Sequence, residues 1–337
     1  MLTASIIICT HNRAAIVGRA IQQALVQARA CNAELLVVDN ASTDETPAAL
    51  ASLARRAEPT LRVVCEPELG LSAARNRGLV EARGEVAAFL DDDAVPRASW
   101  LAALLAPFAA RRVACTGGRI VIRFPDEPPS WFRPELSAAL GEFDLGNESR
   151  RLHYGRAGDY YPYGGNIGFR IADAQTVGGF SPLVGLRGRQ LLAHEETDLC
   201  YRVEEAGGEI HYAPGAVVDH WVLPERLTPQ WFLKRHREGG RSAAIFILRN
   251  RGVLRAIWRV RWHYGSALVT RQYIPREPLE PERLVEECRR QEALGYLVGL
   301  ADGIRRFRTL RRDRMVVRGK LRSAAADGAA ADGAPDG

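Results

Sequence analysis

Short hydrophobic runs alternate with amphipathic segments along the N-terminal part of the chain. Runs rich in aliphatic and β-branched residues lie at 5–9, 34–38, 61–65 and 86–90. Between them, hydrophobic residues recur at helical spacing, most clearly over 14–30 and 72–82. Strands of this length that alternate with helices are typical of a parallel α/β sheet covered on both faces. We therefore expect an α/β fold built on a mostly parallel, twisted sheet with helices on both faces.

Polar residues follow three of the predicted strands directly. The segment 10–13 follows the first strand, Asp39 and Asn40 follow the second, and the triplet 91–93 follows the fourth. In parallel sheets, ligands bind beyond the carboxyl ends of the strands. These side chains are therefore expected to meet at one edge of the sheet and to form a binding site there.

The remainder of the chain divides into three parts. The stretch 125–162 is rich in Pro, Trp and Tyr and predicts a long excursion over the site. A helix near 195–206 and a strand over 210–220 return to the sheet, and they complete a catalytic domain at 1–225. The segment 226–322 predicts a basic helical extension. The Ala/Asp/Gly-rich tail 323–337 predicts disorder.

Charge and cysteine content narrow the setting. The chain of 337 residues carries a net charge of +6, and the excess of arginine follows Arg226. A basic extension can contact nucleic acid, an anionic membrane or a phosphorylated substrate, or it can be a solvated helical surface.

The six cysteines form no C-x-x-C pair and are expected to be reduced core residues. Neither a signal peptide nor a run of about 18 apolar residues is evident, so we expect a cytoplasmic protein, with peripheral contact at the inner membrane face as an alternative.

The triplet Asp91-Asp92-Asp93 is the first candidate for chemistry. Adjacent carboxylates repel one another, and a divalent cation removes that repulsion. Oxygen ligands suit Mg²⁺ or Mn²⁺, often with a substrate phosphate completing the coordination. In an extended segment, Asp91 and Asp93 share one side. The alternative is an acidic turn that caps the helix before Trp100.

Two further segments have the composition of a nucleotide site. The Asp39 carboxylate can accept a hydrogen bond from a base or a ribose, although an Asx turn explains the same residues. The segment 70–78 opens a helix whose free N–H groups attract an anion, and Arg75 or Arg77 can reach a diphosphate. An ordinary surface helix is the alternative.

Glu195 and Glu196 stand at the predicted start of a helix, where the helix dipole stabilises carboxylates. A pair of carboxylates in a dry cleft can instead raise the pKa of one member toward neutrality and provide a general base. His220 follows the last strand and is a candidate metal ligand or phosphate contact, or else a structural histidine.

Taken together, these motifs resemble family 2 glycosyltransferases of the GT-A fold, over roughly residues 4–222. The resemblance rests on the segments 5–13, 37–46, 70–78, 89–96 and 164–170 and on the pair Glu195-Glu196.

The resemblance implies a role for each matched residue. In the donor site, the nucleotide-binding turn would be formed by Thr10, Asn12 and Arg13, and Asp39 would contact the base. Arg75 and Asn76 would line the site. Asp91 or Asp92 would touch the ribose. Asp93 would hold the metal, with Asp91 and His220 as further candidate ligands. Gly165 and Asn166 would lie near the donor sugar and the acceptor. Glu196, where the family usually has Asp, would be the base, with Glu195 as second choice.

The implied activity is inverting transfer of a sugar to a hydroxyl group, with a UDP-sugar as the donor expected by analogy with the family. The cofactor would be Mg²⁺ or Mn²⁺. The acceptor would be a saccharide or a lipid-linked molecule in cell-surface polysaccharide or glycolipid synthesis, and nucleic acid is not an expected partner. The alternative is a non-catalytic sugar-nucleotide-binding or scaffold protein with a basic interaction region. A sugar-nucleotide pyrophosphorylase ranks below both, because no Gly-rich basic loop follows the first strand.

Overall fold

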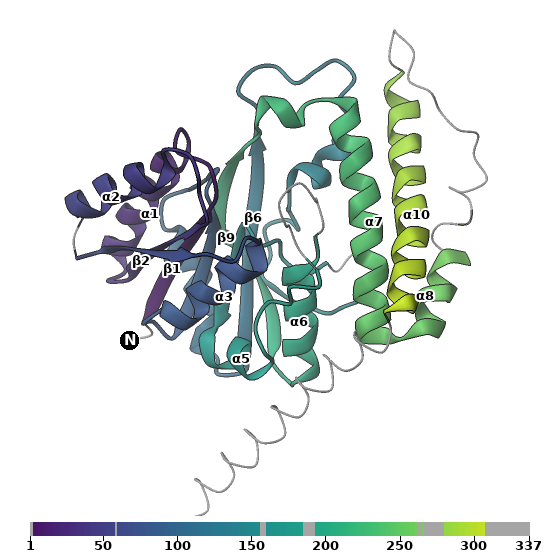
Figure 1. The fold of residues 1–337 in the computed structure, drawn as a ribbon. Coiled ribbons are helices and arrows are strands. Elements are labelled where there is room, and N and C mark those ends of the chain that lie inside the picture. The colour runs from purple at the N-terminus through teal and green to yellow at the C-terminus, as the bar shows by residue number, and fades with distance from the viewer. Residues whose placement is uncertain are drawn as a thin grey trace, which may run out of the picture.

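The computed structural model describes residues 3–57, 59–155, 160–184, 193–261, 265 and 280–306. Within these residues, nine strands form one mixed sheet in the order β3-β2-β1-β4-β8-β6-β9-β5, and β7 pairs with β9 (Figure 1). The first four strands are parallel neighbours: β1 (Ala4–Thr10), β2 (Glu34–Asn40), β3 (Leu61–Glu66) and β4 (Val86–Asp91). This is the parallel half that the sequence predicts.

The second half of the sheet is mixed in direction. β8 (Asn166–Arg170) runs antiparallel between β4 and β6 (Val113–Arg123), and β6 is parallel to β9 (Glu209–Trp221). The short strands β5 (Ala94–Pro96) and β7 (Arg150–Leu152) are both antiparallel to β9. The pairing of β5 with β9 is important for the site, because it sets His220 opposite Ala94, the residue after Asp93.

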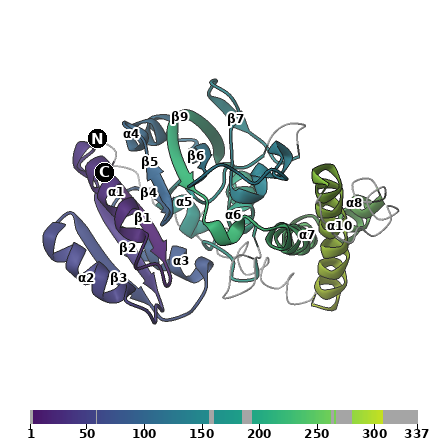
Figure 2. The same ribbon diagram turned by 90° about the horizontal axis from the view of Figure 1, so that it is seen from above.

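Helices cover both faces of the sheet (Figure 2). α1 (Val17–Ala30), α2 (Thr46–Ala57) and α4 (Trp100–Leu105) lie on one face, and α3 (Leu71–Glu81), α5 (Ile171–Thr176) and α6 (Glu195–Glu205) lie on the other. Short 3₁₀ turns, η1 (Ala106–Ala109), η2 (Pro134–Leu140) and η3 (Pro224–Arg226), connect the larger elements. The predicted fold is therefore confirmed, and the helices expected near 72–82 and 195–206 are α3 and α6.

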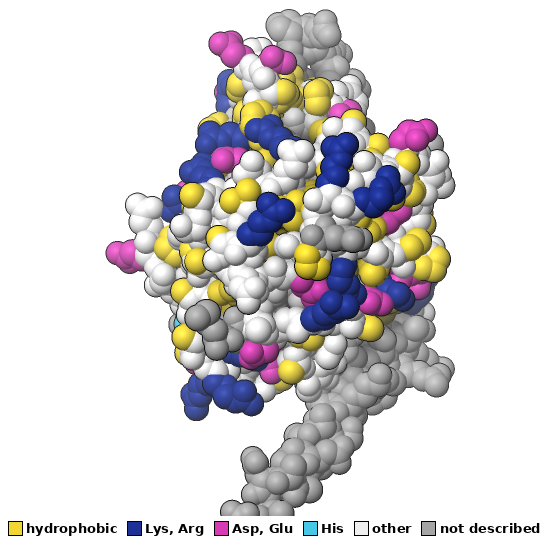
Figure 3. Space-filling model, turned by 90° about the vertical axis from the view of Figure 1, so that its left-hand side faces the viewer, with side chains coloured by type: hydrophobic (Ala, Val, Ile, Leu, Met, Phe, Trp, Pro, Cys, Tyr) yellow, Lys and Arg dark blue, Asp and Glu magenta, His cyan; other side chains and the backbone are white. Residues whose placement is uncertain are grey.

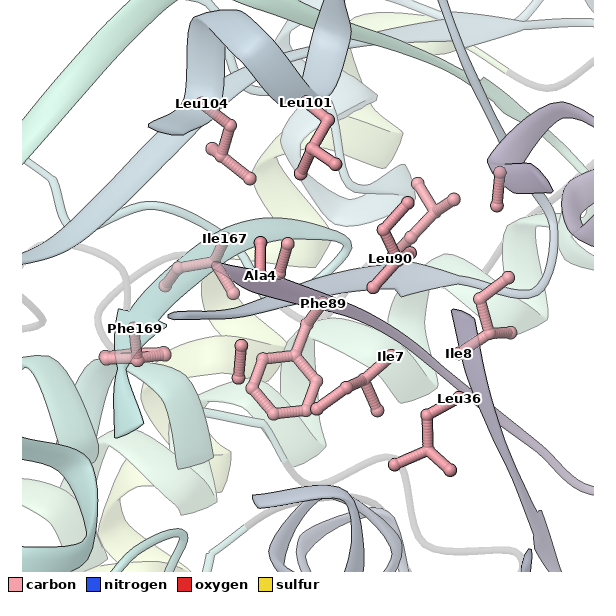
Figure 4. Packing of buried hydrophobic residues seen from close by; sticks show 14 of the residues in the cluster. Ala4, Ile7, Ile8, Leu36, Phe89, Leu90, Leu101, Leu104, Ile167 and Phe169 are labelled. Atoms are coloured by element: carbon pink, nitrogen blue, oxygen red, sulfur yellow. The ribbon is translucent and has the colours of Figure 1, made fainter. Parts of the chain in front are cut away.

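The core lies between the sheet and its two helical layers (Figure 4). Ile7, Leu36 and Phe89 are neighbours in register and point to the face that carries α3, while Ile8 and Leu90 point toward the opposite layer. These side chains are at most 2% exposed, and each contributes about 1.5–3 kcal/mol by leaving water. One expectation is wrong: Cys65 is exposed, whereas Cys115, Cys200 and Cys288 are buried as predicted. Cys65 lies on β3, an edge strand of the sheet that pairs only with β2 among the described strands.

The C-terminal helices stand beside the sheet domain (Figure 1). α7 (Pro229–Arg251) is followed by α8 (Val253–Arg259), and α10 (Pro281–Arg305) packs along α7 in the same direction. Pro281 begins α10, in the first turn, where a proline is tolerated because its missing N–H has no partner within the helix. Residues 307–322 of the predicted extension and the predicted disordered tail 323–337 lie outside the described residues. Among the helices that are described, none has both the length and the apolar character needed to cross a membrane.

Surface charge is mixed on the face shown in Figure 3, where basic, acidic and hydrophobic side chains are interspersed. On this face, the arginine excess is therefore not gathered into one patch.

Candidate active site

A cavity of about 720 Å³ opens where the carboxyl ends of β1, β2 and β4 meet the starts of α3 and α6 and one side of α7. The strand ends are aligned, because Thr10 pairs with Asp39 and Cys9 with Asp91. The cavity is lined by residues from the strand ends, the two helix starts and the extension, among them Thr10, Arg13, Asn40, Arg75, Asp91, Asp92, Asp93, Gly165, Glu195, Glu196, His220, Arg226, Trp231 and Arg235.

The three adjacent aspartates face different partners. Asp92 accepts a hydrogen bond of 2.7 Å from the Thr10 hydroxyl. Burial and the neighbouring Asp93 carboxylate raise the pKa of Asp92 to about 7. Asp91 lies 3.5 Å from the Arg75 guanidinium, and its side chain is 40% exposed. Asp91 is thus the aspartate of the triplet that opens most freely toward the cavity.

Asp93 is almost fully enclosed by cationic partners. His220 Nε2 lies 2.9 Å from Asp93 Oδ1, and Arg226 Nη2 lies 3.1 Å from Oδ2. Burial alone would raise the pKa of Asp93, but the charges of His220 and Arg226 outweigh burial and hold this pKa below its usual range. Asp93 also raises the pKa of His220 against the opposing effect of that ring's burial. The two side chains therefore stabilise each other as an ion pair.

Asp91, Asp93 and His220 form a candidate metal site. Each offers one ligand atom, and the three atoms lie within 4.8 Å of one another. Two carboxylates and one imidazole are a donor set that suits Mn²⁺, and Mg²⁺ is compatible with the carboxylates. The three predicted ligands therefore lie close together, although Asp92 and Asp93 form a turn between β4 and β5 and not the extended segment that the sequence suggested.

The other end of the cavity carries the acidic pair at the start of α6. Glu195 is buried, and its Oε1 lies 2.8 Å from Arg75 Nη1. Glu196 also lines the cavity, and burial together with the adjacent Glu195 charge raises the pKa of Glu196 to about 8. The two neighbouring carboxyl groups thus differ in their surroundings: Glu195 is paired with Arg75, whereas the pKa of Glu196 is raised toward neutrality.

Arg75 connects the two ends of the cavity. Its guanidinium contacts both Asp91 and Glu195, and its side chain is only 4% exposed. Burial opposes its charge, but the two carboxylates outweigh burial and raise the pKa of Arg75. Arg75 is therefore a permanent cation between the metal ligands and the acidic pair.

The Gly164-Gly165 pair makes room for these side chains. A Cβ atom on Gly164 would overlap the Arg75 guanidinium, and one on Gly165 would lie 2.6 Å from Asp91 Oδ2. The predicted site residue Gly165 thus lies against a candidate metal ligand.

Two predicted donor residues near the strand ends, Asn12 and Asp39, are not among the described residues that line the cavity. Asn12 Oδ1 accepts a 2.8 Å hydrogen bond from the Thr43 N–H, and this bond ties together the loops after β1 and β2. Asp39 Oδ1 accepts from the Ser42 N–H at 3.3 Å, which is the Asx-type turn weighed from the sequence. Their contacts with a nucleotide stay predictions.

Asn76 and Asn166 also lie outside the lining. Asn76 exchanges two hydrogen bonds, of 2.7 and 2.9 Å, with the backbone of Phe180. Asn166 accepts from the Trp100 indole at 2.8 Å, and its amide donates to the carbonyls of Arg119 and Ala216. Both amides tie together segments that are distant in sequence, and their proposed substrate contacts also stay predictions.

Arg226, Trp231 and Arg235 are among the cavity side chains that could not be picked out as site residues from the sequence. Trp231 and Arg235 are four residues apart on α7 and so share a helix face, which was the available signal. Arg226 carries no local signal, because its contact with Asp93 depends on the tertiary fold.

Comparison with known proteins decides the family. The model of the family described as "Glycosyl transferase family 2" matches residues 5–178, which is more than half of the chain. The chain belongs to glycosyltransferase family 2. The match includes the acidic triplet, Arg75 and Gly165, whereas Glu196, His220 and the extension lie beyond it.

Curated relatives match about half to two thirds of this chain. A "Pre-mycofactocin glycosyltransferase" of Mycobacterium tuberculosis is 32% identical over 178 residues, which are 53% of this chain and 35% of the relative. A "Glucosyl-dolichyl phosphate glucuronosyltransferase" of Haloferax volcanii is 27% identical over 53% of this chain and 56% of its own length. The "Succinoglycan biosynthesis protein ExoM" of Rhizobium meliloti is 26% identical over 67% of this chain and 69% of its own length. The chain thus matches about a third to two thirds of the length of these three relatives.

Solved structures support the GT-A fold. The mannosyltransferase PcManGT from Pyrobaculum calidifontis, solved with GDP-Man and Mn²⁺, has a TM-score of 0.52 at 19% identity and covers 96% of this chain and 87% of its own. GalNAc-T7, solved with UDP, GalNAc and Mn²⁺, has a TM-score of 0.52 at 18% identity over 74% of this chain and 50% of its own.

Proposed function

We propose that this chain is a metal-dependent, inverting glycosyltransferase that moves a sugar from a nucleoside-diphosphate donor to an acceptor hydroxyl group. One observation carries the proposal: a candidate metal site and the acidic pair Glu195-Glu196 share one cavity, and Arg75 contacts Asp91 of the metal site and Glu195 of the acidic pair. Membership of family 2 supports this proposal. Two structures with the same fold support it as well, because one was solved with GDP-Man and Mn²⁺ and the other with UDP, GalNAc and Mn²⁺.

The donor would bind at the strand-end side of the cavity. Asp93, Asp91 and His220 would hold Mg²⁺ or Mn²⁺, which when bound neutralises charge on the diphosphate leaving group. Arg75, a buried cation beside Asp91, would stabilise the same developing charge. Asp92 and the Thr10 hydroxyl, already hydrogen-bonded to each other, are the candidates for the ribose.

The acceptor would bind at the α6 side. Ionised Glu196 takes the proton of the acceptor hydroxyl as that oxygen attacks the anomeric carbon of the donor sugar. The bond from the anomeric carbon to the diphosphate oxygen breaks with its electron pair leaving on the nucleoside diphosphate. A single displacement on the face opposite the leaving group inverts the anomeric configuration. Glu195 suits this role less well, because its carboxylate is already bonded to Arg75.

The acceptor class is proposed from the relatives and from one surface of the extension. Relatives named for dolichyl phosphate and succinoglycan chemistry favour a saccharide or lipid-linked acceptor in glycoconjugate synthesis. On α8, Leu254, Ile257 and Trp258 are 85%, 52% and 48% exposed, and they alternate with arginines. Such a surface suits the interface of an anionic membrane. Flotation with phosphatidylglycerol vesicles tests this contact, and equal binding by Leu254→Ser/Trp258→Ser and wild type would contradict it.

The catalytic proposal is tested by a donor screen read by proton NMR. UDP-, GDP- and dTDP-sugars are incubated with Mn²⁺ and a panel of saccharide and lipid-phosphate acceptors. We expect one donor to yield a product of inverted anomeric configuration, and we expect Glu196→Gln to bind that donor but to lose transfer. A product of retained configuration, or full activity in Glu196→Gln, would contradict the mechanism. If the wild type binds the donor and transfers nothing, the non-catalytic alternative replaces it.

A further inference from the structure

Arg226 belongs to the C-terminal part of the chain, yet it contacts the candidate metal site of the sheet domain. It ends the turn η3 between β9 and α7, outside the region matched by the family model. Its Nη2 lies 3.1 Å from Asp93 Oδ2, while His220 Nε2 lies 2.9 Å from Oδ1 of the same carboxylate. The Arg226 side chain is 23% exposed and lines the cavity. It is therefore next to both the metal ligand and the space where a donor would lie.

The charges around Asp93 make the effect of Arg226 depend on what is bound. A divalent cation bound to Asp93 would lie close to the positively charged guanidinium of Arg226, and like charges repel strongly in a partly buried site. Arg226 therefore opposes binding of a cation that arrives without a nucleotide. A cation that arrives with a nucleoside diphosphate brings two or more negative charges with it. The same guanidinium then faces an anion and favours binding, because arginine pairs well with phosphate oxygens.

We propose that Arg226 couples the metal to the donor: it weakens binding of the cation alone and strengthens binding of the cation together with a nucleoside diphosphate. The inference rests on the proposed function, since it needs the cation at Asp93 and the diphosphate beside it. It makes Arg226 a positioning residue of the donor complex. It also gives the segment between the sheet domain and the extension a part in donor recognition.

A competing role makes the opposite prediction. If Arg226 only orients the Asp93 carboxylate, as outer partners of metal ligands commonly do, its removal should weaken the cation with and without nucleotide. The sign of the change in metal affinity in the absence of nucleotide therefore separates the two roles.

The test measures Mn²⁺ binding by electron paramagnetic resonance, with and without saturating UDP, GDP or dTDP. Arg226→Gln keeps a hydrogen-bond donor and removes the charge, and Arg226→Lys keeps the charge. Arg97→Gln is the matched control, because Arg97 pairs with Asp219 at 2.7 Å on the same strand as His220 but is not a lining residue of the cavity. Thermal unfolding of each variant establishes that it is folded.

We expect Arg226→Gln to bind Mn²⁺ alone about threefold more tightly and Mn²⁺ in the presence of nucleotide about threefold more weakly. The gain in Mn²⁺ affinity caused by the nucleotide should therefore fall by about tenfold, within the usual range of coupling between sites. Arg226→Lys and Arg97→Gln should behave like wild type. By reciprocity, the effect of Mn²⁺ on nucleotide affinity should fall by the same factor in Arg226→Gln.

Two results would overturn the inference while leaving the proposed function intact: weaker Mn²⁺ binding by Arg226→Gln in both states, or coupling equal to that of wild type. If wild type binds Mn²⁺ in neither state, the metal site of the proposed function fails, and the inference fails with it.

Discussion

At the scale of single residues, Glu196 determines when the proposed chemistry can run. Its pKa is raised to about 8 by burial and by Glu195, with Arg75 acting in the opposite direction. Below that pH the side chain is mainly protonated and cannot accept a proton from an acceptor. A bound cation and the Arg75 charge favour the ionised form, so donor binding would prepare the base.

The raised pKa of Glu196 has a consequence for stability. In the unfolded chain this carboxyl group loses its proton in the ordinary range of a glutamate, whereas in the folded protein it does so only near pH 8. As pH rises from the ordinary range of a glutamate to about 8, the free energy of unfolding of wild type therefore falls relative to that of Glu196→Gln. Above about pH 8 the two free energies differ by a constant amount. Urea unfolding from pH 5 to 9 checks this, with the exposed Glu127→Gln as control. Parallel curves for wild type and Glu196→Gln would show that the pKa of Glu196 is not raised.

Gly165 provides a second test at this scale. A methyl group there would lie 2.6 Å from Asp91 Oδ2, and its three nearest atoms all belong to the Asp91 side chain, so it would displace this carboxylate rather than the backbone. Gly165→Ala should weaken Mn²⁺ binding about tenfold, similar to the loss of a supporting contact to a metal ligand, while thermal stability changes little. Gly18→Ala is the control, because no atom lies within 4 Å of a Cβ atom at that position. Unchanged Mn²⁺ affinity in Gly165→Ala would argue against Asp91 as a ligand.

At the scale of elements, local patterns predicted where the polar side chains lie. Strand ends and the start of α6 are set by residues close in sequence, so Asp91, Asp93 and Glu196 could be found from hydrophobic runs and helix signals. The hydrogen bonds that Asn166 makes to distant strands could not be predicted from such local patterns. Its amide bonds to the Arg119 and Ala216 carbonyls, beside a register shift between β6 and β9 after Gly118. That irregularity arises from the pairing of distant strands, which no short pattern encodes.

The position of α6 depends on a buried polar cluster. Asp198 is fully buried and bonds to Arg202 of its own helix and to Arg249 and Asn250 of α7. This cluster fixes the helix that carries Glu195 and Glu196 against the extension. Sequence analysis identified the helix but not its anchor, because Arg249 looked like one of many surface arginines.

Asp198→Asn should therefore be strongly destabilising. It leaves two buried guanidinium groups without their carboxylate, and breaking a buried pair in this way costs about 3–5 kcal/mol. Chemical denaturation gives the free energy of unfolding. Glu282→Gln is the control, because Glu282 is 76% exposed and pairs with Arg133, so its loss should cost about 1 kcal/mol or less. A cost for Asp198→Asn as small as that of the control would refute the anchoring role.

At the scale of the whole molecule, the C-terminal helices form one wall of the cavity. α7 contributes Trp231 and Arg235, and it is itself held by close packing against α10. A Cβ atom on Gly240, Gly295 or Gly299 would overlap a backbone carbonyl of the facing helix. The sequence predicted a basic helical extension, but its contact with the cavity rests on this helix pairing, which residue composition does not reveal.

Gly295→Ala tests this arrangement. The added methyl would meet the Arg237 carbonyl, so α7 and α10 must separate, at a cost of about 1–3 kcal/mol for overpacking. We expect a lower melting temperature and weaker acceptor use, with nucleotide binding at the strand ends retained. Gly239→Ala is the control on α7, since no atom lies within 4 Å of a Cβ atom there. Wild-type stability in Gly295→Ala would contradict the close helix contact.

The proposed mechanism requires a nucleotide site that depends on both a divalent cation and Asp93. This dependence can be measured by calorimetric titration of UDP, GDP and dTDP into wild type and Asp93→Asn, each with and without Mn²⁺. We expect one nucleotide to bind wild type only when Mn²⁺ is present and to bind Asp93→Asn far more weakly. Binding that is indifferent to Mn²⁺ and to Asp93, or no binding of any of the three nucleotides, would contradict it.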